Sequence, residues 1–165
     1  MEEKSFHNSA VRTISVEDWL SLSESDVTIP VQVTLSGVSM EPLIRKGKDV
    51  VTLLPVSRPL KKGDVVIFKR QDGAYVCHRI FRIGNGVVQT MGDNCVNLDI
   101  PISIDSVYAL AVSVQRGNKT INLDTGLARF MGLCRLLYRR FRAYAVKLLY
   151  PAYKRIKSVV KRNNG

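Results

Sequence analysis

Three short stretches of the chain contain residue types that acyl-transfer chemistry requires. Ser39 lies in the turn Gly-Val-Ser-Met-Glu-Pro at 37–42, His78 lies in a β-type run, and a Gly-Asp-Asn loop supplies Asp93, followed by Asp99. A serine hydroxyl is a weak nucleophile until an adjacent base takes its proton, and histidine titrates near neutrality. A carboxylate on the second ring nitrogen fixes the tautomer and stabilises the imidazolium. Either aspartate has the type needed for that task.

Each of these residues also has an ordinary structural interpretation. A serine in a glycine-bounded turn is usually a solvated turn residue, a strand histidine usually packs, and the aspartates suit turns and caps. The only other histidine, His7, lies in a polar stretch and is expected to be solvated. The joint occurrence of three blocks in one order favours the catalytic interpretation.

In this order the blocks resemble those of the signal peptidase I family. Its pattern is a Gly-x-Ser-Met-x-Pro turn, a basic residue before Arg-Val or Arg-Ile, and a Gly-Asp-Asn loop, and the resemblance covers roughly residues 31–113. It implies Ser39 as nucleophile and His78 as general base, as in the endoplasmic reticulum and archaeal-like branch; bacterial members and the related self-cleaving repressors use lysine. It also implies that Asp99 orients the histidine, with Asp93 as a supporting acid.

The turn around Ser39 is the candidate oxyanion-binding site. Its backbone N–H, in the turn shared with Gly37 and Met40, is the expected donor, and one such donor contributes roughly 3 kcal/mol. The second donor is not identified. Some relatives place a hydroxyl side chain where Gly37 stands, and the family often has a second Asn where Cys95 stands. Signal peptidases also carry a transmembrane helix before the serine block, where this chain is polar, so a housekeeping secretory role is not expected.

Strands are the elements that must position these residues. Alternating or continuous apolar runs separated by turn residues occur at 31–35, 49–54, 64–69, 74–83, 86–91 and 107–115. They predict a mainly β fold, with a signal-peptidase or repressor-protease-like β domain over residues 30–125. Residues 1–29 are expected to be a polar lead-in with one short helix near 17–22.

A basic amphipathic helical tail is predicted for residues 126–165. Residues 127–165 hold 11 Lys/Arg and no Asp/Glu, whereas residues 1–126 hold 14 of each. Basic residues fill most of one side of a helical wheel, with Leu136 and Val146 as exceptions, and Pro151 is expected to break or kink the tail into two pieces. The other side is an apolar arc of about 160°. The arc contains Phe130, Met131, Leu133, Cys134, Leu137, Tyr138, Phe141, Tyr144 and Leu148.

Such a tail is typical of a segment that lies on an anionic membrane surface, here through residues 127–162. The alternative is that the apolar face packs on the β core while the arginines are merely solvated. Nucleic acid is a less suitable partner, because the tail has no turn-and-recognition-helix arrangement and its aromatic residues lie apart from the arginines.

Composition sets the limits for these hypotheses. With 165 residues, 45% of them hydrophobic, the chain suits one domain with appendages. Three cysteines without a Cys-x-x-Cys spacing predict neither a disulfide framework nor a zinc site, and no cofactor is expected. Cys77 is expected to face the core, opposite His78. No secretory signal and no run of 18 apolar residues is found, so a cytoplasmic location, peripheral at the membrane, is expected.

The resemblance therefore implies a serine endopeptidase that cleaves an extended leader or precursor peptide after small residues. Two alternatives stay open. One is a DNA-associated regulator of the self-cleaving repressor type, against which stand the histidine in place of lysine and the lack of an N-terminal helix-turn-helix. The other is a catalytically inactive module of the same fold that binds a peptide.

Overall fold

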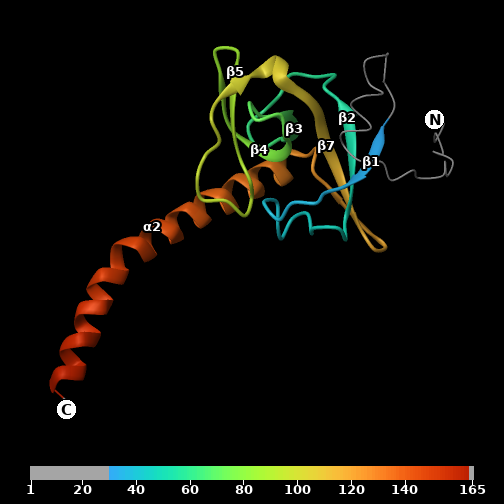
Figure 1. Cartoon of the computed structure of the whole chain (residues 1–165). Helices are drawn as coiled ribbons and strands as arrows, with labels where there is room; N and C mark the ends of the chain where they lie inside the picture. The colour runs from blue at the N-terminus through green and yellow to red at the C-terminus, as the bar shows by residue number, and fades with distance from the viewer. Residues whose placement is uncertain (1–29, 164–165) are drawn as a thin grey trace.

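Eight strands and one long helix form the regular structure of residues 30–163, the part of the chain that this computed structural model describes (Figure 1). The short helix expected near 17–22 lies outside the described residues. The elements in chain order are β1 (Val31–Thr34), β2 (Val50–Pro55), β3 (Val65–Lys69), β4 (Tyr75–Gly84), β5 (Val87–Met91), β6 (Ile102–Ser103), the 3-10 turn η1 (Ile104–Ser106), β7 (Val107–Arg116), β8 (Lys119–Asn122) and α2 (Gly126–Asn163).

All strand pairs are antiparallel and belong to one curled sheet. The strand order is β1-β2-β7-β3-β4-β5-β6, with β8 paired to β7. The long strand β7 is central because it pairs with β2 along one part and with β3 along another. The fold is therefore mainly β, as the alternating runs predict, and each of the six expected runs forms a strand.

The sheet has an apolar cluster on each face. On β3, Val65 and Ile67 belong to one cluster while Val66 and Phe68 belong to the other, so four consecutive residues are buried. Successive side chains of a strand point to opposite faces. Cys77 accordingly packs in the first cluster, as expected. The His78 ring lies edge-on to Phe68 on the other face, with centroids 6.2 Å apart.

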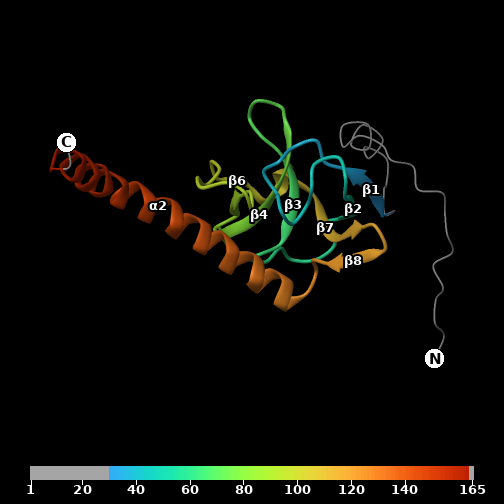
Figure 2. The same cartoon turned by 90° about the horizontal axis from the view of Figure 1, so that it is seen from below.

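The helix α2 begins after Thr125, whose side-chain oxygen accepts a hydrogen bond from the N–H of Ala128 at 3.1 Å. It then continues through Pro151 without interruption, so the expected division into two helical pieces is not found. Figures 1 and 2 show its first turns beside β3 and β4 and its second half projecting beyond the sheet.

The face by which α2 contacts the sheet differs from the apolar arc. Leu136 is completely buried, and Gly132 packs on the guanidinium group of Arg79. A second close contact joins Gly63, before β3, to the backbone of Arg129. In the sequence pattern Leu136 is an exception on the polar side of the helix. In the structure it is the residue by which α2 packs on the sheet, and most of the apolar arc is exposed.

Four charged residues fix the first turn of α2 to the sheet. Arg58 donates to both oxygens of the buried Asp64, at 2.9 Å each, and to Asp124 at 2.6 Å. Arg129 of the helix donates to the same two carboxylates, at 3.3 and 2.8 Å. These contacts hold the pKa of Asp124 below its usual value, although its partial desolvation acts in the opposite direction.

Candidate active site

His78 and Asp99 form the best-defined polar contact of the candidate site. The ring Nδ1 lies 2.6 Å from Asp99 Oδ2, and the same oxygen accepts a hydrogen bond from the Thr90 hydroxyl at 2.6 Å. Thr90 and His78 are 1% and 5% exposed, whereas the side chain of Asp99 is 18% exposed, so the contact is only partly shielded from water. Gln89 donates to the backbone carbonyl of Asp99 at 3.0 Å and fixes the segment that carries it.

The charge of Asp99 determines which tautomer the histidine adopts. Burial raises the pKa of this carboxyl, but the hydrogen bonds from His78 and Thr90 together outweigh it, so the pKa of Asp99 lies below its usual value. An ionised Asp99 accepts a hydrogen bond from Nδ1–H. We therefore infer that the neutral imidazole keeps its proton on Nδ1, which leaves the Nε2 lone pair free to accept one.

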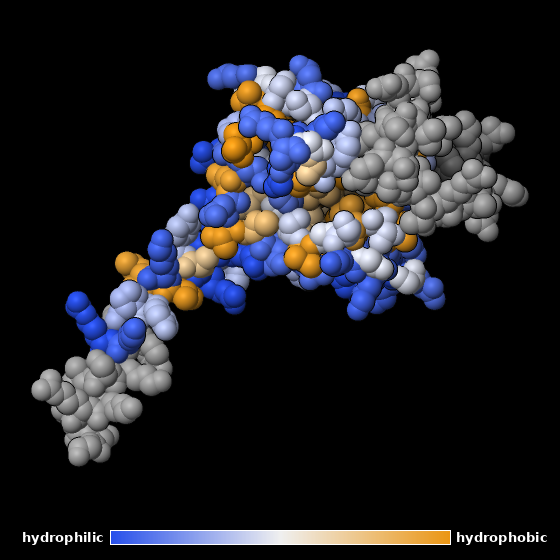
Figure 3. All heavy atoms as spheres, viewed as in Figure 1, coloured by the Kyte–Doolittle hydropathy of each residue, from blue (hydrophilic) through white to orange (hydrophobic). Residues whose placement is uncertain are grey.

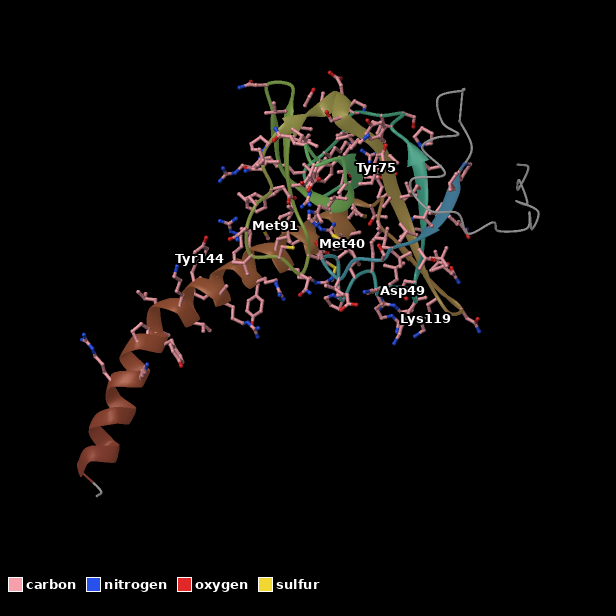
Figure 4. The ribbon with its side chains drawn as sticks, viewed as in Figure 1. Met40, Asp49, Tyr75, Met91, Lys119 and Tyr144 are labelled. Carbon is pink, nitrogen blue, oxygen red and sulfur yellow. The ribbon has the colours of Figure 1, made fainter. Side chains whose placement is uncertain are left out.

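Gly92 lies between the histidine and the turn of Ser39. A methyl carbon placed on Gly92 would lie 2.6 Å from the backbone oxygen of Ser39 and 2.9 Å from His78 Nε2. Two elements far apart in sequence thus meet at a position where only glycine fits. Figure 4 labels Met40 and Met91, the neighbours of Ser39 and Gly92, on the side of the sheet where α2 begins.

Asn94 fixes the loop of Gly92 to the turn of Ser39. Its backbone N–H donates to the carbonyl of Ser39 at 2.6 Å, and its side-chain amide donates to the carbonyl of Val38 at 3.1 Å. These two bonds join the loop of Gly92 to the turn of Ser39.

The buried side chain of Met40 anchors the turn of Ser39 to the core. Met40 is 1% exposed and packs in the first apolar cluster, while Glu41 N–H closes the turn on the carbonyl of Val38 at 3.2 Å. Within residues 30–163, the N–H of Ser39 donates to no protein acceptor. Its Oγ likewise makes no hydrogen bond to His78 there.

Asp93 does not approach the histidine. It forms a buried, two-pronged ion pair with Arg79, whose Nε and Nη2 donate to its two oxygens at 2.8 Å each. Arg79 also donates to the carbonyl of Gly63 at 2.7 Å. Asp93 is thus a structural partner of the residue that follows His78, and Asp99 alone of the two aspartates contacts the ring.

All three cysteines are free, and they differ in exposure. Burial raises the pKa of Cys77 to about 12, so its thiol is inert. Cys95 lies beside Gly92, and burial and the nearby Asp99 raise the pKa of its thiol as well. Among residues 30–163 no group of three or more His, Cys, Asp or Glu side chains is arranged to hold a metal ion.

A surface pocket of about 450 Å³ opens beside Asp99. Its wall combines apolar side chains with polar and charged ones, and neither Ser39 nor His78 belongs to it. Phe68, Arg70, Gln71, Asp72, Leu98, Asp99, Ile100 and Ile102 line it.

The roles of Thr90 and Gly92 and the Arg79–Asp93 pair were not predicted from the sequence. A threonine in a β-run carries no mark that distinguishes a carboxylate partner from a surface residue. Gly92 and Asp93 belong to the Gly-Asp-Asn loop and Arg79 follows His78, so the two family-like blocks were the only signal for these residues.

Comparisons with known proteins add no identification: no family model matches the chain, and neither a curated protein nor a solved structure matches it significantly. No helix in the described part of the chain is long and apolar enough to cross a membrane.

Proposed function

We propose that the chain is a serine endopeptidase of the signal peptidase I type, in which Ser39 is the nucleophile and His78 the general base. The observation that carries the proposal is the part-buried contact of 2.6 Å between His78 Nδ1 and Asp99, with Nε2 directed at the glycine that packs on Ser39. The curled antiparallel sheet is compatible with the fold that the sequence blocks imply.

In the proposed reaction, Ser39 Oγ attacks the peptide carbonyl carbon while its proton moves to His78 Nε2. The N–H of Ser39 donates to the oxyanion of the tetrahedral intermediate. The imidazolium then gives its proton to the departing amine as the C–N bond breaks, which leaves an acyl-enzyme. Water, deprotonated by the same nitrogen, releases the acid and restores the serine. Asp99 stays ionised throughout and stabilises the imidazolium.

The substrate class follows from the resemblance. An extended leader or precursor segment with small residues before the scissile bond would place its backbone along the Ser39 turn.

A peptide library read by mass spectrometry tests the activity without a known substrate. The wild-type chain is expected to cut after small residues, and Ser39→Ala and His78→Ala to abolish cutting. Ser36→Ala, in the same loop but exposed, and His7→Ala are the matched controls and should cut normally. Cleavage that survives Ser39→Ala would contradict the proposal. A wild-type chain that retains peptides but cuts none would favour a binding module instead.

A further inference from the structure

The docked and the exposed faces of α2 lie on nearly opposite sides of the helix. Gly132 and Leu136 contact the sheet, while Phe141 and Leu148 are 72% and 78% exposed. At 3.6 residues per turn the two sets are centred roughly 150° apart. The arc that the sequence marks as apolar therefore points away from the β core, and packing on that core does not explain it.

The exposed apolar set is continuous over six turns of the helix, and Figure 3 shows its orange residues along the projecting part. A monomer rarely leaves such a stripe uncovered unless it meets a partner or a lipid phase. Its members are Leu127, Phe130, Met131, Leu137, Tyr138, Phe141, Tyr144, Leu148 and Leu149, each more than half exposed.

The charges beside the exposed apolar stripe of α2 indicate what kind of partner covers it. Residues 127–165 hold 11 Lys/Arg and no acidic residue. Arg135 and Arg142, both exposed, border one edge of the stripe, and Arg140 stacks on Tyr144 at the other, 5.8 Å from the ring centroid. A stripe flanked by cations matches the boundary between lipid acyl chains and anionic headgroups.

The other occupants fit less well. A second copy would bring one set of 11 cations against another, and like charges oppose association. A nucleic acid would pair with the cations but leave the aromatic and leucine side chains in water.

We propose that the exposed face of α2 binds an anionic phospholipid surface, with the helix lying in the plane of the interface and the β core held above it. The inference rests on α2 alone and does not depend on peptidase activity. The docked turns of the same helix cover the Arg79–Asp93 pair next to His78, so the candidate active site is held close to the lipid surface.

Vesicle flotation with the full chain tests the proposal. Wild type is expected to bind vesicles with about one-third phosphatidylserine at least tenfold more tightly than pure phosphatidylcholine vesicles, with loss of binding in high salt. The double variant Phe141→Glu/Leu148→Glu should bind the anionic vesicles at least about 30-fold more weakly than wild type. Val87→Glu, an exposed apolar residue of β5, is the matched control and should stay within about twofold of wild type.

Three results would overturn the proposal. One is equal binding of wild type and the double variant to anionic vesicles. Another is the absence of wild-type binding to either vesicle. The third is a concentration-dependent wild-type dimer in analytical ultracentrifugation that the double variant abolishes, because the apolar face would then bind a second copy. Both replaced residues are exposed, so the variant is expected to fold, and circular dichroism checks this.

Discussion

The contact between Gly63 and α2 provides a graded test of how the helix is held. Gly63 has φ +90°, and a methyl group there would lie 2.8 Å from the backbone oxygen of Arg129 and 2.9 Å from its Cα. Gly73 has φ +85°, with nothing within 4 Å of the same position. Alanine at either position carries similar backbone strain, so only Gly63→Ala adds a collision with a helix backbone.

The two contributions can be estimated separately. A positive φ at a non-glycine residue costs about 1–2 kcal/mol, and overpacking adds about 1–3 kcal/mol. Gly73→Ala should therefore lower the free energy of unfolding by about 1–2 kcal/mol and Gly63→Ala by about 2–5 kcal/mol. For a chain of this size 1 kcal/mol corresponds to about 2–4 °C, so Gly63→Ala should melt roughly 2–12 °C below Gly73→Ala.

Urea and thermal unfolding followed by circular dichroism measure this difference, and amide hydrogen exchange reports whether the first turns of α2 loosen. Faster exchange in those turns is expected in Gly63→Ala only. Equal unfolding midpoints for the two variants, together with unchanged exchange in α2, would refute the docking described here.

Three further outcomes are expected. Gly92→Ala should lower any Ser39-dependent activity by about 100-fold, because the methyl group displaces the Ser39 backbone or the His78 ring. Gly84→Ala has open space around the added methyl group and should keep its activity. Equal activities of the two variants would contradict the placement of Gly92 between Ser39 and His78. Asp99→Asn should lower activity by about 10³–10⁴-fold, as removal of the carboxylate that holds the tautomer does in triad enzymes, while the exposed Asp105→Asn serves as control; an active Asp99→Asn variant would remove Asp99 from the mechanism. Asp49, fully buried, has a lowered pKa because hydrogen bonds from Arg116 and Arg45 outweigh desolvation, so its contribution is present above the usual carboxyl pKa of about 4 and is lost as pH falls further. Asp49→Asn should cost roughly 2 kcal/mol at pH 7 and make the remaining stability less sensitive to acid, which urea titrations between pH 7 and pH 3 measure; an unchanged acid sensitivity would contradict this.

Strand positions were predictable because they depend on local alternation and turn residues. Each of the six runs from 31–35 to 107–115 forms a strand. The strands β6 and β8 were missed because each contains a single apolar residue, which gives no alternating pattern. The hairpin at Gly117, with φ +56°, was not marked as a turn either.

The docking of α2 was not predictable because it depends on shape and not on hydropathy. Gly132 and Leu136 lie on the side where arginines predominate, and the sheet accepts that side because Asp64 pairs with Arg129 and Asp93 with Arg135. An apolar arc usually marks the buried side of a helix, and here it marks the exposed one.

Within the site, the pairing of His78 with Asp99 agrees with the arrangement that the resemblance implied, whereas Asp93 turned out to belong to Arg79. Sequence spacing could not separate the two aspartates, because both follow the same strand and only the curl of the 92–99 segment decides which one reaches the ring. The roles of Ser39, His78 and Asp99 in catalysis stay predictions.

Covalent labelling of the wild-type chain with a fluorophosphonate, read by peptide mass spectrometry, tests whether His78 activates Ser39. We expect modification of Ser39 that is lost in Ser39→Ala and reduced at least about 100-fold in His78→Ala, because the hydroxyl needs the base. Labelling of Ser39 that is equal with and without His78, or no labelling under conditions where a control serine hydrolase reacts, would contradict it.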